Sequence, residues 1–248
     1  MNTRLIALML GLGSVSTAWA ADPTIEELLL ATDDVVRGES SVASTEMYVK
    51  TARYERTMKM KTWSMGTDKT LVVIMEPAKD QGTATLKVDD NIWNYLPKVD
   101  RTMKLPAGMM GGSWMGSHFT NDDLVQDSRL SEKFNASFSA KPVDGVGNYT
   151  IDLIPKEDAA VVWGKITLEI TPDKVPVRQL FYDEDGALVR TMTFSNVKLI
   201  DGRKVPTEFR LVPADKPNEE TRFTYLDIDF DVEVPESTFS LQSLKSGK

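Results

Sequence analysis

The pattern that most constrains this chain is the spacing of its hydrophobic residues, which changes near Val42 and then keeps a period of two over most of the sequence. In residues 54–62, Met58 and Met60 share one face with Arg56, whereas charged and hydroxyl side chains occupy the other face. Such alternation is typical of β-strands that bury one face and expose the other to water. The chain is therefore predicted to be mainly β.

Short turns separate the predicted strands. Asp185-Gly186 and Asp201-Gly202 indicate tight hairpins, because these residues tolerate the left-handed backbone that such turns need. Parallel strands would need long helical crossovers, for which the spacing of the turns leaves no room. We expect an antiparallel meander of about eleven strands in a single domain, since neither a second domain nor an internal repeat is evident.

The N-terminus has the features of a secretory signal peptide. Arg4 precedes an apolar run over residues 5–12, and small residues stand at positions 18 and 20. The run is too short for a membrane span, which needs about 20 apolar residues. We expect cleavage after Ala20, so that residues 1–20 are removed and residues 21–248 form the exported domain.

One helix is expected ahead of the strands. Over residues 24–37 the apolar positions recur at helical spacing, Thr24 and Glu27 match a capping box, and Gly38 provides a stop signal. A helix of this length is too small to cover the apolar face of about ten strands. The fold therefore needs a further cover, either from the chain or from a ligand.

Composition excludes several classes of function. The chain has no Cys, which removes disulfides, thiolate zinc sites and cysteine nucleophiles. Its 37 acidic and 29 basic residues give a net charge of −8, which argues against nucleic acid as a partner. His118 is the single imidazole, and no nucleophile or second base stands at a spacing that would complete a catalytic set. We therefore expect neither enzymatic activity nor a cofactor.

Residues 106–119 depart from the strand pattern. This segment holds four glycines, three methionines and one tryptophan, a composition that combines backbone freedom with adaptable apolar contact. We predict a movable apolar cover in which Trp114 is the main anchor and which contributes little to the core. Thr120 is expected to cap a helical turn that follows.

The methionines gather in the same half of the chain. Nine of the ten in residues 21–248 lie between positions 47 and 115. A Met-rich surface adapts to apolar ligands of varied shape, but methionine also fills ordinary cores. For Met58 and Met60 both interpretations, cavity lining and core, stay open.

Three segments carry a resemblance to a known family: Pro77 with Gly82, residues 92–97 (IWNYLP), and residues 114–124 (WMGSHFTNDDL). In these segments the chain resembles the outer-membrane lipoprotein-sorting proteins, which are similar in fold to the carriers LolA and LolB. The resemblance implies an open antiparallel β-barrel, or half-barrel, of about eleven strands covered by the N-terminal helix and by a lid of helices and loops. It covers nearly all of residues 21–248.

The same resemblance implies a carrier in the periplasm of a Gram-negative bacterium, with lipid, lipoprotein acyl chains or another hydrophobic molecule as cargo. The implied partner is an inner-membrane exporter of the resistance–nodulation–division or ABC permease type, and the implied destination is the outer membrane. We expect a monomer. The expected ligand-binding residues, on the cavity face and in the lid, are Arg56, Met58, Met60, Trp93, Tyr95, Met103, Met109, Met110, Trp114, Met115 and Phe119.

Two features of the sequence leave alternatives. Arg56 shares a face with methionines, so a buried guanidinium would need a partner such as a lid carbonyl, a carboxylate or a ligand phosphate, unless its strand end lies in water. Met109, Met110, Met115 and His118 stand within ten residues and are soft ligands that suit copper(I). A copper-binding periplasmic protein is therefore the alternative function.

Overall fold

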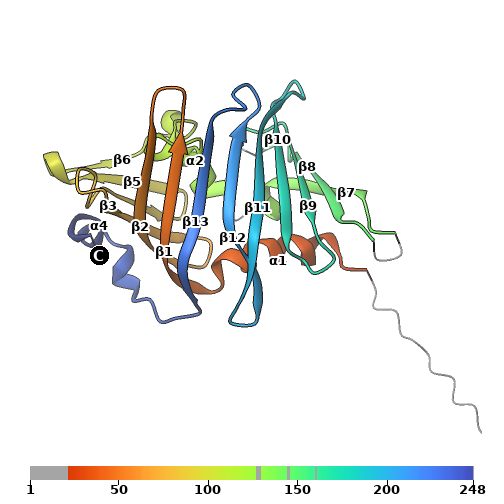
Figure 1. Ribbon diagram of the computed structural model, residues 1–248, viewed down its shortest axis with the longest axis horizontal. Helices are drawn as coiled ribbons and strands as arrows, with labels where there is room; N and C mark the ends of the chain where they lie inside the picture. The colour runs from red at the N-terminus through yellow and green to blue at the C-terminus, as the bar shows by residue number, and fades with distance from the viewer. Residues whose placement is uncertain (1–21, 127–129, 144–145, 160, 248) are drawn as a thin grey trace, which may run out of the picture.

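The computed structural model describes residues 22–126, 130–143, 146–159 and 161–247. Its centre is one 13-stranded antiparallel sheet in the order β6-β5-β4-β3-β2-β1-β13-β12-β11-β10-β9-β8-β7 (Figure 1). The predicted signal peptide and its cleavage site after Ala20 lie outside the described residues. Within the described residues, none of the helices combines the length and the apolar character that a membrane crossing requires.

The strands vary from four to 13 residues in length. They are β1 (Ser40–Lys50), β2 (Glu55–Met65), β3 (Lys69–Glu76), β4 (Ala84–Val88), β5 (Asn91–Leu96), β6 (Arg101–Lys104), β7 (Phe134–Ala140), β8 (Tyr149–Pro155), β9 (Lys165–Ile170), β10 (Pro176–Tyr182), β11 (Leu188–Ile200), β12 (Arg203–Pro213) and β13 (Glu220–Phe230).

The helices are short and lie at the start of the chain, in the middle and at the end. The α-helices are α1 (Ile25–Arg37), α2 (Asn121–Gln126), α3 (Leu130–Lys133) and α4 (Leu241–Ser246). Single 3-10 turns are η1 (Pro97–Val99), η2 (Ala107–Met109), η3 (Trp114–Gly116) and η4 (Glu236–Phe239).

Nearly every strand pairs with its neighbours in sequence, which confirms the predicted meander. The exception is β1, which pairs with β2 and with the last strand, β13, while β6 and β7 remain as the two edges. The barrel is therefore open, as expected. It has thirteen strands rather than about eleven, because a strand such as β6, with four residues, is too short for a period to be counted.

The first helix confirms its predicted boundaries. The backbone N–H of Glu27 donates to Thr24 Oγ1 over 3.2 Å, and the backbone N–H of Thr24 donates to Glu27 Oε2 over 3.1 Å, which is a capping box. The helix ends before Gly38, whose φ of +62° suits glycine at a helix C-terminus. Leu28 and Leu29 are buried against β7–β10, so α1 covers that half of the sheet.

Different elements cover the two faces of the sheet. We call the face that packs on α1 and on Trp114 the inner face, and the opposite face the outer face. The outer face of β3, β4 and β5 is covered by η4 and α4, through Phe239 and Leu244 (Figure 1). This double cover explains the apolar run at 71–75, because Leu71 lies under α4 while Val72, its neighbour, packs on the inner face beneath Trp114.

The alternation predicted in β13 holds only in part. Ile228 and Phe230 are buried, but Leu226 is 52% exposed. A register shift in β1 places Asp227 opposite Ser44 and Tyr225 opposite the next residue, Thr45, so Leu226 is the extra residue at a bulge. In β9 the predicted alternation is intact, with Ile166, Leu168 and Ile170 all buried.

Truncation of Leu168 tests the core beneath α1. We expect Leu168→Ala to lower the free energy of unfolding by about 3 kcal/mol, because it removes buried methyl groups and leaves a cavity. Urea unfolding of the purified protein measures this loss. The matched control is Leu199→Ala on the exposed part of β11, which should change stability by less than about 0.5 kcal/mol. Equal losses in the two variants would contradict the position of the core.

Candidate functional site

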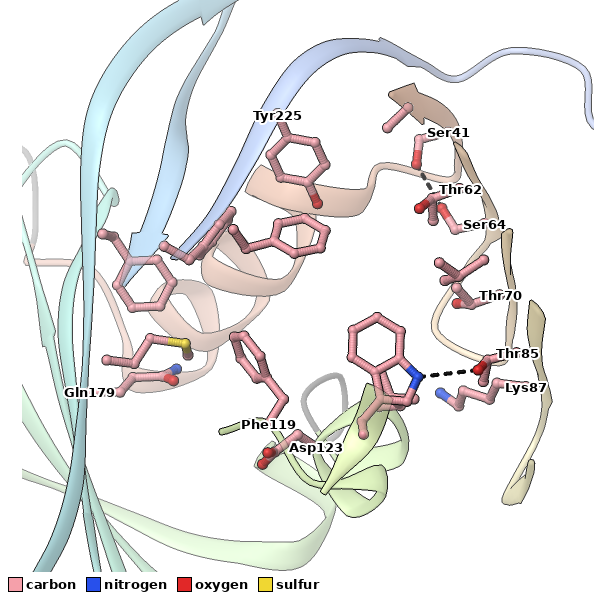
Figure 2. A pocket seen from close by; sticks show the side chains of 18 of the residues that line it. Ser41, Thr62, Ser64, Thr70, Thr85, Lys87, Phe119, Asp123, Gln179 and Tyr225 are labelled. Carbon is pink, nitrogen blue, oxygen red and sulfur yellow. Dashed lines mark hydrogen bonds between the residues drawn. The ribbon is translucent and has the colours of Figure 1, made fainter. Parts of the chain in front are cut away.

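A cavity of about 190 Å³ lies between the inner face and the segment that follows β6 (Figure 2). It is enclosed by strands from both halves of the sheet, by α1 and by the residues around α2. Its lining residues are Thr32, Ser41, Ala43, Thr62, Ser64, Thr70, Val72, Thr85, Lys87, Trp114, Phe119, Asp123, Leu124, Gln179, Met192, Phe194, Phe209, Phe223 and Tyr225.

The lining has two walls of different chemistry. One, which we call the polar wall, is formed by hydroxyl side chains and one ammonium group from β1–β4: Ser41, Thr62, Ser64, Thr70, Thr85 and Lys87. The other, the aromatic wall, is formed by side chains from β11–β13: Phe194, Phe209, Phe223 and Tyr225. Figure 2 shows the residues of the polar wall on one side of the cavity, with Phe119, Asp123 and Gln179 across from them and Tyr225 at the top of the view. A ligand in this cavity would meet apolar and polar groups at the same time.

The aromatic wall is a continuous cluster. The ring of Phe209 lies edge-on to three others, with centroid distances of 5.2 Å to Phe194, 6.3 Å to Phe223 and 5.7 Å to Tyr225. Such edge-to-face pairs fix ring orientation and add to the burial energy. Across the cavity Ala43 and Ser64 present much smaller side chains. The space exists because small side chains oppose rings that are held in place by one another.

The polar wall has its own hydrogen bonds. The hydroxyls of Ser41 and Ser64 lie 2.7 Å apart, and Lys87 Nζ donates to the backbone carbonyl of Thr67. The hydroxyl of Thr62 is buried and finds no partner among the described residues. On the other side of the cavity, the amide oxygen of Gln179 is also buried without a partner in the described part of the chain. The cavity therefore presents polar atoms that a ligand could satisfy.

The 106–119 segment is fastened to the sheet by Trp114. Its side chain is only 4% exposed and packs among buried residues that include Met58 and Met60, while Nε1 donates to Thr85 Oγ1 over 3.1 Å. Thr85 in turn donates to Asn94 Oδ1 over 2.7 Å. The expectation that Trp114 contributes little to the core is wrong, because truncation of a buried Trp costs about 3–5 kcal/mol.

Two side chains at the start of β2 hold the turn that follows Trp114. Arg56 Nη2 donates to the backbone carbonyl of Met115, and Tyr54 Oη donates to the carbonyl of Gly116 over 2.5 Å. Of the partners considered for Arg56 from the sequence, the structure therefore has the lid carbonyl. Gly116 has φ +67°, and a Cβ there would lie 3.1 Å from the Tyr54 hydroxyl, so only glycine fits this contact.

His118 fixes the next part of the segment to β13. Its Nε2 lies 3.1 Å from Glu219 Oε2, and its Nδ1 lies 2.8 Å from Thr221 Oγ1, which also accepts from the His118 backbone N–H over 3.0 Å. Because an ionised carboxylate only accepts, Nε2 carries the proton and Nδ1 accepts from the Thr221 hydroxyl. The hydrogen bond from His118, followed by that from the backbone N–H of Ala52, lowers the pKa of Glu219.

A buried ion pair fastens the following helix. Thr120 and Asp123 form the predicted N-terminal cap of α2, with the backbone N–H of Asp123 donating to Thr120 Oγ1 over 3.1 Å. The carboxylate of Asp123 also accepts from Arg190, with 2.7 Å between Oδ2 and Nη1. The guanidinium of Arg190 lies over two adjacent rings, those of Trp163, at 4.4 Å, and Phe181, at 4.2 Å, whose centroids are 5.1 Å apart. The ion pair with Arg190 engages both oxygens of the Asp123 carboxylate.

The predicted site residues fall into three groups. Trp114 and Phe119 line the cavity, whereas Met58 and Met60 are core residues next to Trp114. Trp93 and Tyr95 are not part of the described lining, because they lie on the outer face under the C-terminal segment.

The remaining methionines of the prediction do not gather at one point. Met103 pairs with Asn94 at the edge of the sheet, Met109 is 56% exposed, and Met115 packs beside the core cluster of Trp114. Met110 is half-buried, and its carbonyl accepts from the backbone N–H of Asp122. Both ring nitrogens of His118 are engaged, so this side chain is not directed toward the three lid methionines as a shared copper site would require.

The polar wall was not predicted from the sequence. Alternating serine, threonine and lysine at 62, 64, 70, 85 and 87 looks like a face in water, and only the cover above it makes this face internal. The signal was present in β2, where one face changes from Met58 and Met60 to Thr62 and Ser64 along the strand. A face that is partly apolar and partly hydroxyl-bearing indicates a boundary between core and cavity.

Comparison with known proteins gives the family of this chain. A family model described as "-like: Uncharacterized protein" matches residues 66–246. The chain belongs to that family. Among curated proteins, nothing matches the chain.

Solved structures of the same fold come from several bacteria. A DUF1329 family protein from Desulfovibrio piger has a TM-score of 0.78 and 22% identity, covering 88% of this chain and 96% of that one. An outer membrane lipoprotein-sorting protein domain from Vibrio parahaemolyticus has a TM-score of 0.75 and 24% identity, covering 89% and 96%. A LolA superfamily protein from Nitrosomonas europaea has a TM-score of 0.74 and 21% identity, covering 89% and 99%. The expected open-barrel fold of the lipoprotein-sorting proteins is confirmed.

The link between His118 and Glu219 should make stability depend on pH. Because the folded pKa of Glu219 lies below the ordinary value of 4.5, its contribution is full above that value and is lost as pH falls through the folded pKa. We expect the stability difference between the wild type and Glu219→Gln to shrink on acidification below pH 4.5, as measured by urea unfolding at a series of pH values.

The control for this measurement is Glu184→Gln in an exposed turn. Its difference from the wild type should stay small at every pH. A Glu219→Gln difference that grows on acidification would contradict the assigned hydrogen bond.

Proposed function

We propose that residues 21–248 form a periplasmic carrier that holds the acyl chain of a lipid or lipoprotein in the cavity beneath the 106–119 segment. The observation that carries this proposal is the cavity itself, in which a wall of four aromatic rings faces small side chains under a cover fastened by Trp114. Apolar pockets of this kind, with a few polar groups, are the usual form of small-molecule sites.

The comparisons support the same class of function. Two of the similar structures are described as an outer membrane lipoprotein-sorting protein domain and as a LolA superfamily protein. The sequence adds the features of a signal peptide before Ala21, which agrees with a place outside the cytoplasm. As partners we propose an inner-membrane exporter of the resistance–nodulation–division or ABC permease type and the outer membrane, with the carrier acting as a monomer.

A carrier explains the lining better than an enzyme does. Asp123 is the one carboxylate in the described lining, and it is already paired with Arg190. General acid–base or nucleophilic catalysis needs a group with a free proton site or lone pair in reach of the substrate. The lining instead offers surface area, which is what retention of an apolar chain requires.

The size of the cavity limits how much of a chain it encloses. A cavity of about 150 Å³ holds benzene, so 190 Å³ accommodates roughly eight carbons. At about 0.8 kcal/mol per buried CH₂, eight carbons would contribute roughly 6 kcal/mol before the entropic costs of binding. A longer acyl chain would enter only if the cover moves or its side chains repack. Gly108 and Gly111 are exposed with open space around them, which suits such a displacement.

Cavity filling tests the proposed binding site. Ala43 is buried on the inner face and lines the cavity, so Ala43→Leu should occupy part of the ligand's space. We expect saturable binding of a fluorescent fatty acid to the delipidated wild type, and affinity lower by about tenfold or more in Ala43→Leu, since each lost CH₂ contact costs about 0.8 kcal/mol.

The matched control is Ala187→Leu in an exposed turn, which adds the same side chain away from the cavity. Its affinity should equal that of the wild type. Absence of saturable binding to the wild type, or stoichiometric copper(I) binding in its place, would contradict the proposed function.

Limited proteolysis tests the movement of the cover. Gly111 and Gly112 are exposed, and we expect cleavage beside them by a protease of broad specificity to slow when fatty acid is bound, because the ligand restrains the segment. Cleavage in the exposed turn at Gly186 should be unchanged, which separates a local effect from a general one. Equal rates near Gly111 with and without ligand would show that the segment does not respond to cargo.

A further inference from the structure

We propose that Gln179 binds the hydroxyl head of an uncharged single-chain amphiphile, such as a fatty alcohol, inside the cavity. This inference rests on the proposed function and assigns it a ligand class. The feature that points to it is a carboxamide that lines the cavity, is only 4% exposed, and has an amide oxygen without a partner among the described residues.

Gln179 occupies a core position of β10. Its partners on the two neighbouring strands are Leu168 of β9 and Met192 of β11, and both of those side chains are buried in the core cluster beneath α1. Neither side chain has the N–H or O–H donor that an amide oxygen needs. A buried amide without a partner costs free energy that an apolar side chain of similar size would not, so stability alone does not explain this residue.

The charged side chains of the described lining, Asp123 and Lys87, are engaged within the chain. Both oxygens of Asp123 accept from Arg190. Lys87 donates to the backbone carbonyl of Thr67 and has a further interaction within the chain. A charged headgroup would lose its hydration on entry and would meet only charges that are already engaged, so an uncharged head is favoured.

A hydroxyl group is the uncharged head that matches a carboxamide. It can donate to the amide oxygen, whereas the oxygen of an ether or an ester only accepts. Figure 2 shows Gln179 across the cavity from the polar wall, on the same side as Phe119. The next cavity-lining residue of β11 after Met192 is Phe194, which packs on Phe209 in the aromatic wall. With its head at Gln179, the ligand therefore has its chain along the aromatic rings.

Three ligands of a size that the cavity encloses test this assignment: 1-octanol, its isomer 1-methoxyheptane, and octanoic acid at neutral pH. Their affinities for the delipidated mature protein are measured by competition with a fluorescent fatty acid. We expect 1-octanol to bind about tenfold or more tightly than 1-methoxyheptane, because the ether contains the same atoms but has no donor. Octanoate also has no donor and should bind no more tightly than the ether.

Gln179→Met removes the amide at similar length and should bring 1-octanol to the affinity of the ether, with ether binding unchanged. Because the amide oxygen has no partner in the described chain, the midpoint of urea unfolding of the ligand-free variant should be unchanged or raised. The matched control is Gln242→Met, which makes the same change at an exposed position of α4 and should keep the preference for 1-octanol. Should Gln179→Met not fold, Gln179→Leu is the second variant, with the same expected loss of preference.

The results that overturn the proposal differ from those that overturn the carrier function. If 1-octanol competes no better than the ether or octanoate, the hydroxyl assignment fails and the carrier function stands. If Gln179→Met keeps the preference for 1-octanol, or lowers the midpoint of urea unfolding as loss of a structural hydrogen bond would, Gln179 is not the group that binds the head. If the fluorescent fatty acid shows no saturable binding to the wild type, the carrier function fails as well.

Discussion

The insertion of one indole ring into the inner face of the sheet determines the rest of the site. Trp114 fills the space over Met58 and Met60, and its N–H reaches Thr85 on β4. This contact gives a glycine-rich loop a fixed position over the sheet. Arg56 adds a hydrogen bond to the backbone carbonyl of Met115, the residue that follows Trp114. Without a side chain of this size there, the inner face of β2–β4 would be a groove in water, and its serines and threonines would be an ordinary solvated surface.

The features predicted well from sequence were those with local causes. The capping boxes at Thr24 and Thr120, the hairpin turns and the one-sided strands each depend on residues a few positions apart. Alternation predicts which residues of a strand share a face. It does not predict which element packs on that face. Trp93 and Tyr95 share a face, and the element that decides its environment is the C-terminal segment with Phe239, far along the chain. Their placement under that segment, away from the cavity, could not be derived from alternation alone.

The cavity depends on a mismatch of sizes across the sheet. Large rings on β11–β13 brace one another, so they cannot collapse onto the small side chains of β1 and β2 that face them. A core normally reaches close packing by such collapse. Here the contacts among the rings of the aromatic wall prevent these rings from packing against the small side chains opposite them. Polar residues such as Thr62 and Lys87, which were not predicted as site residues from the sequence, therefore line a cavity and not a closed core.

The pairing of β1 with β13 has a consequence for how the molecule assembles. Ser41 lies opposite Phe230, so the seam joins residues almost a whole chain apart, whereas every other pair of strands is close in sequence. Contacts this distant close a long loop, which costs more conformational entropy than the pairing of strands that are neighbours in sequence. The two halves can each fold as local meanders, but the cavity between them comes into being only when the last strand arrives. A nascent chain that still lacks β13 would therefore have the aromatic wall only in part, and no enclosed cavity.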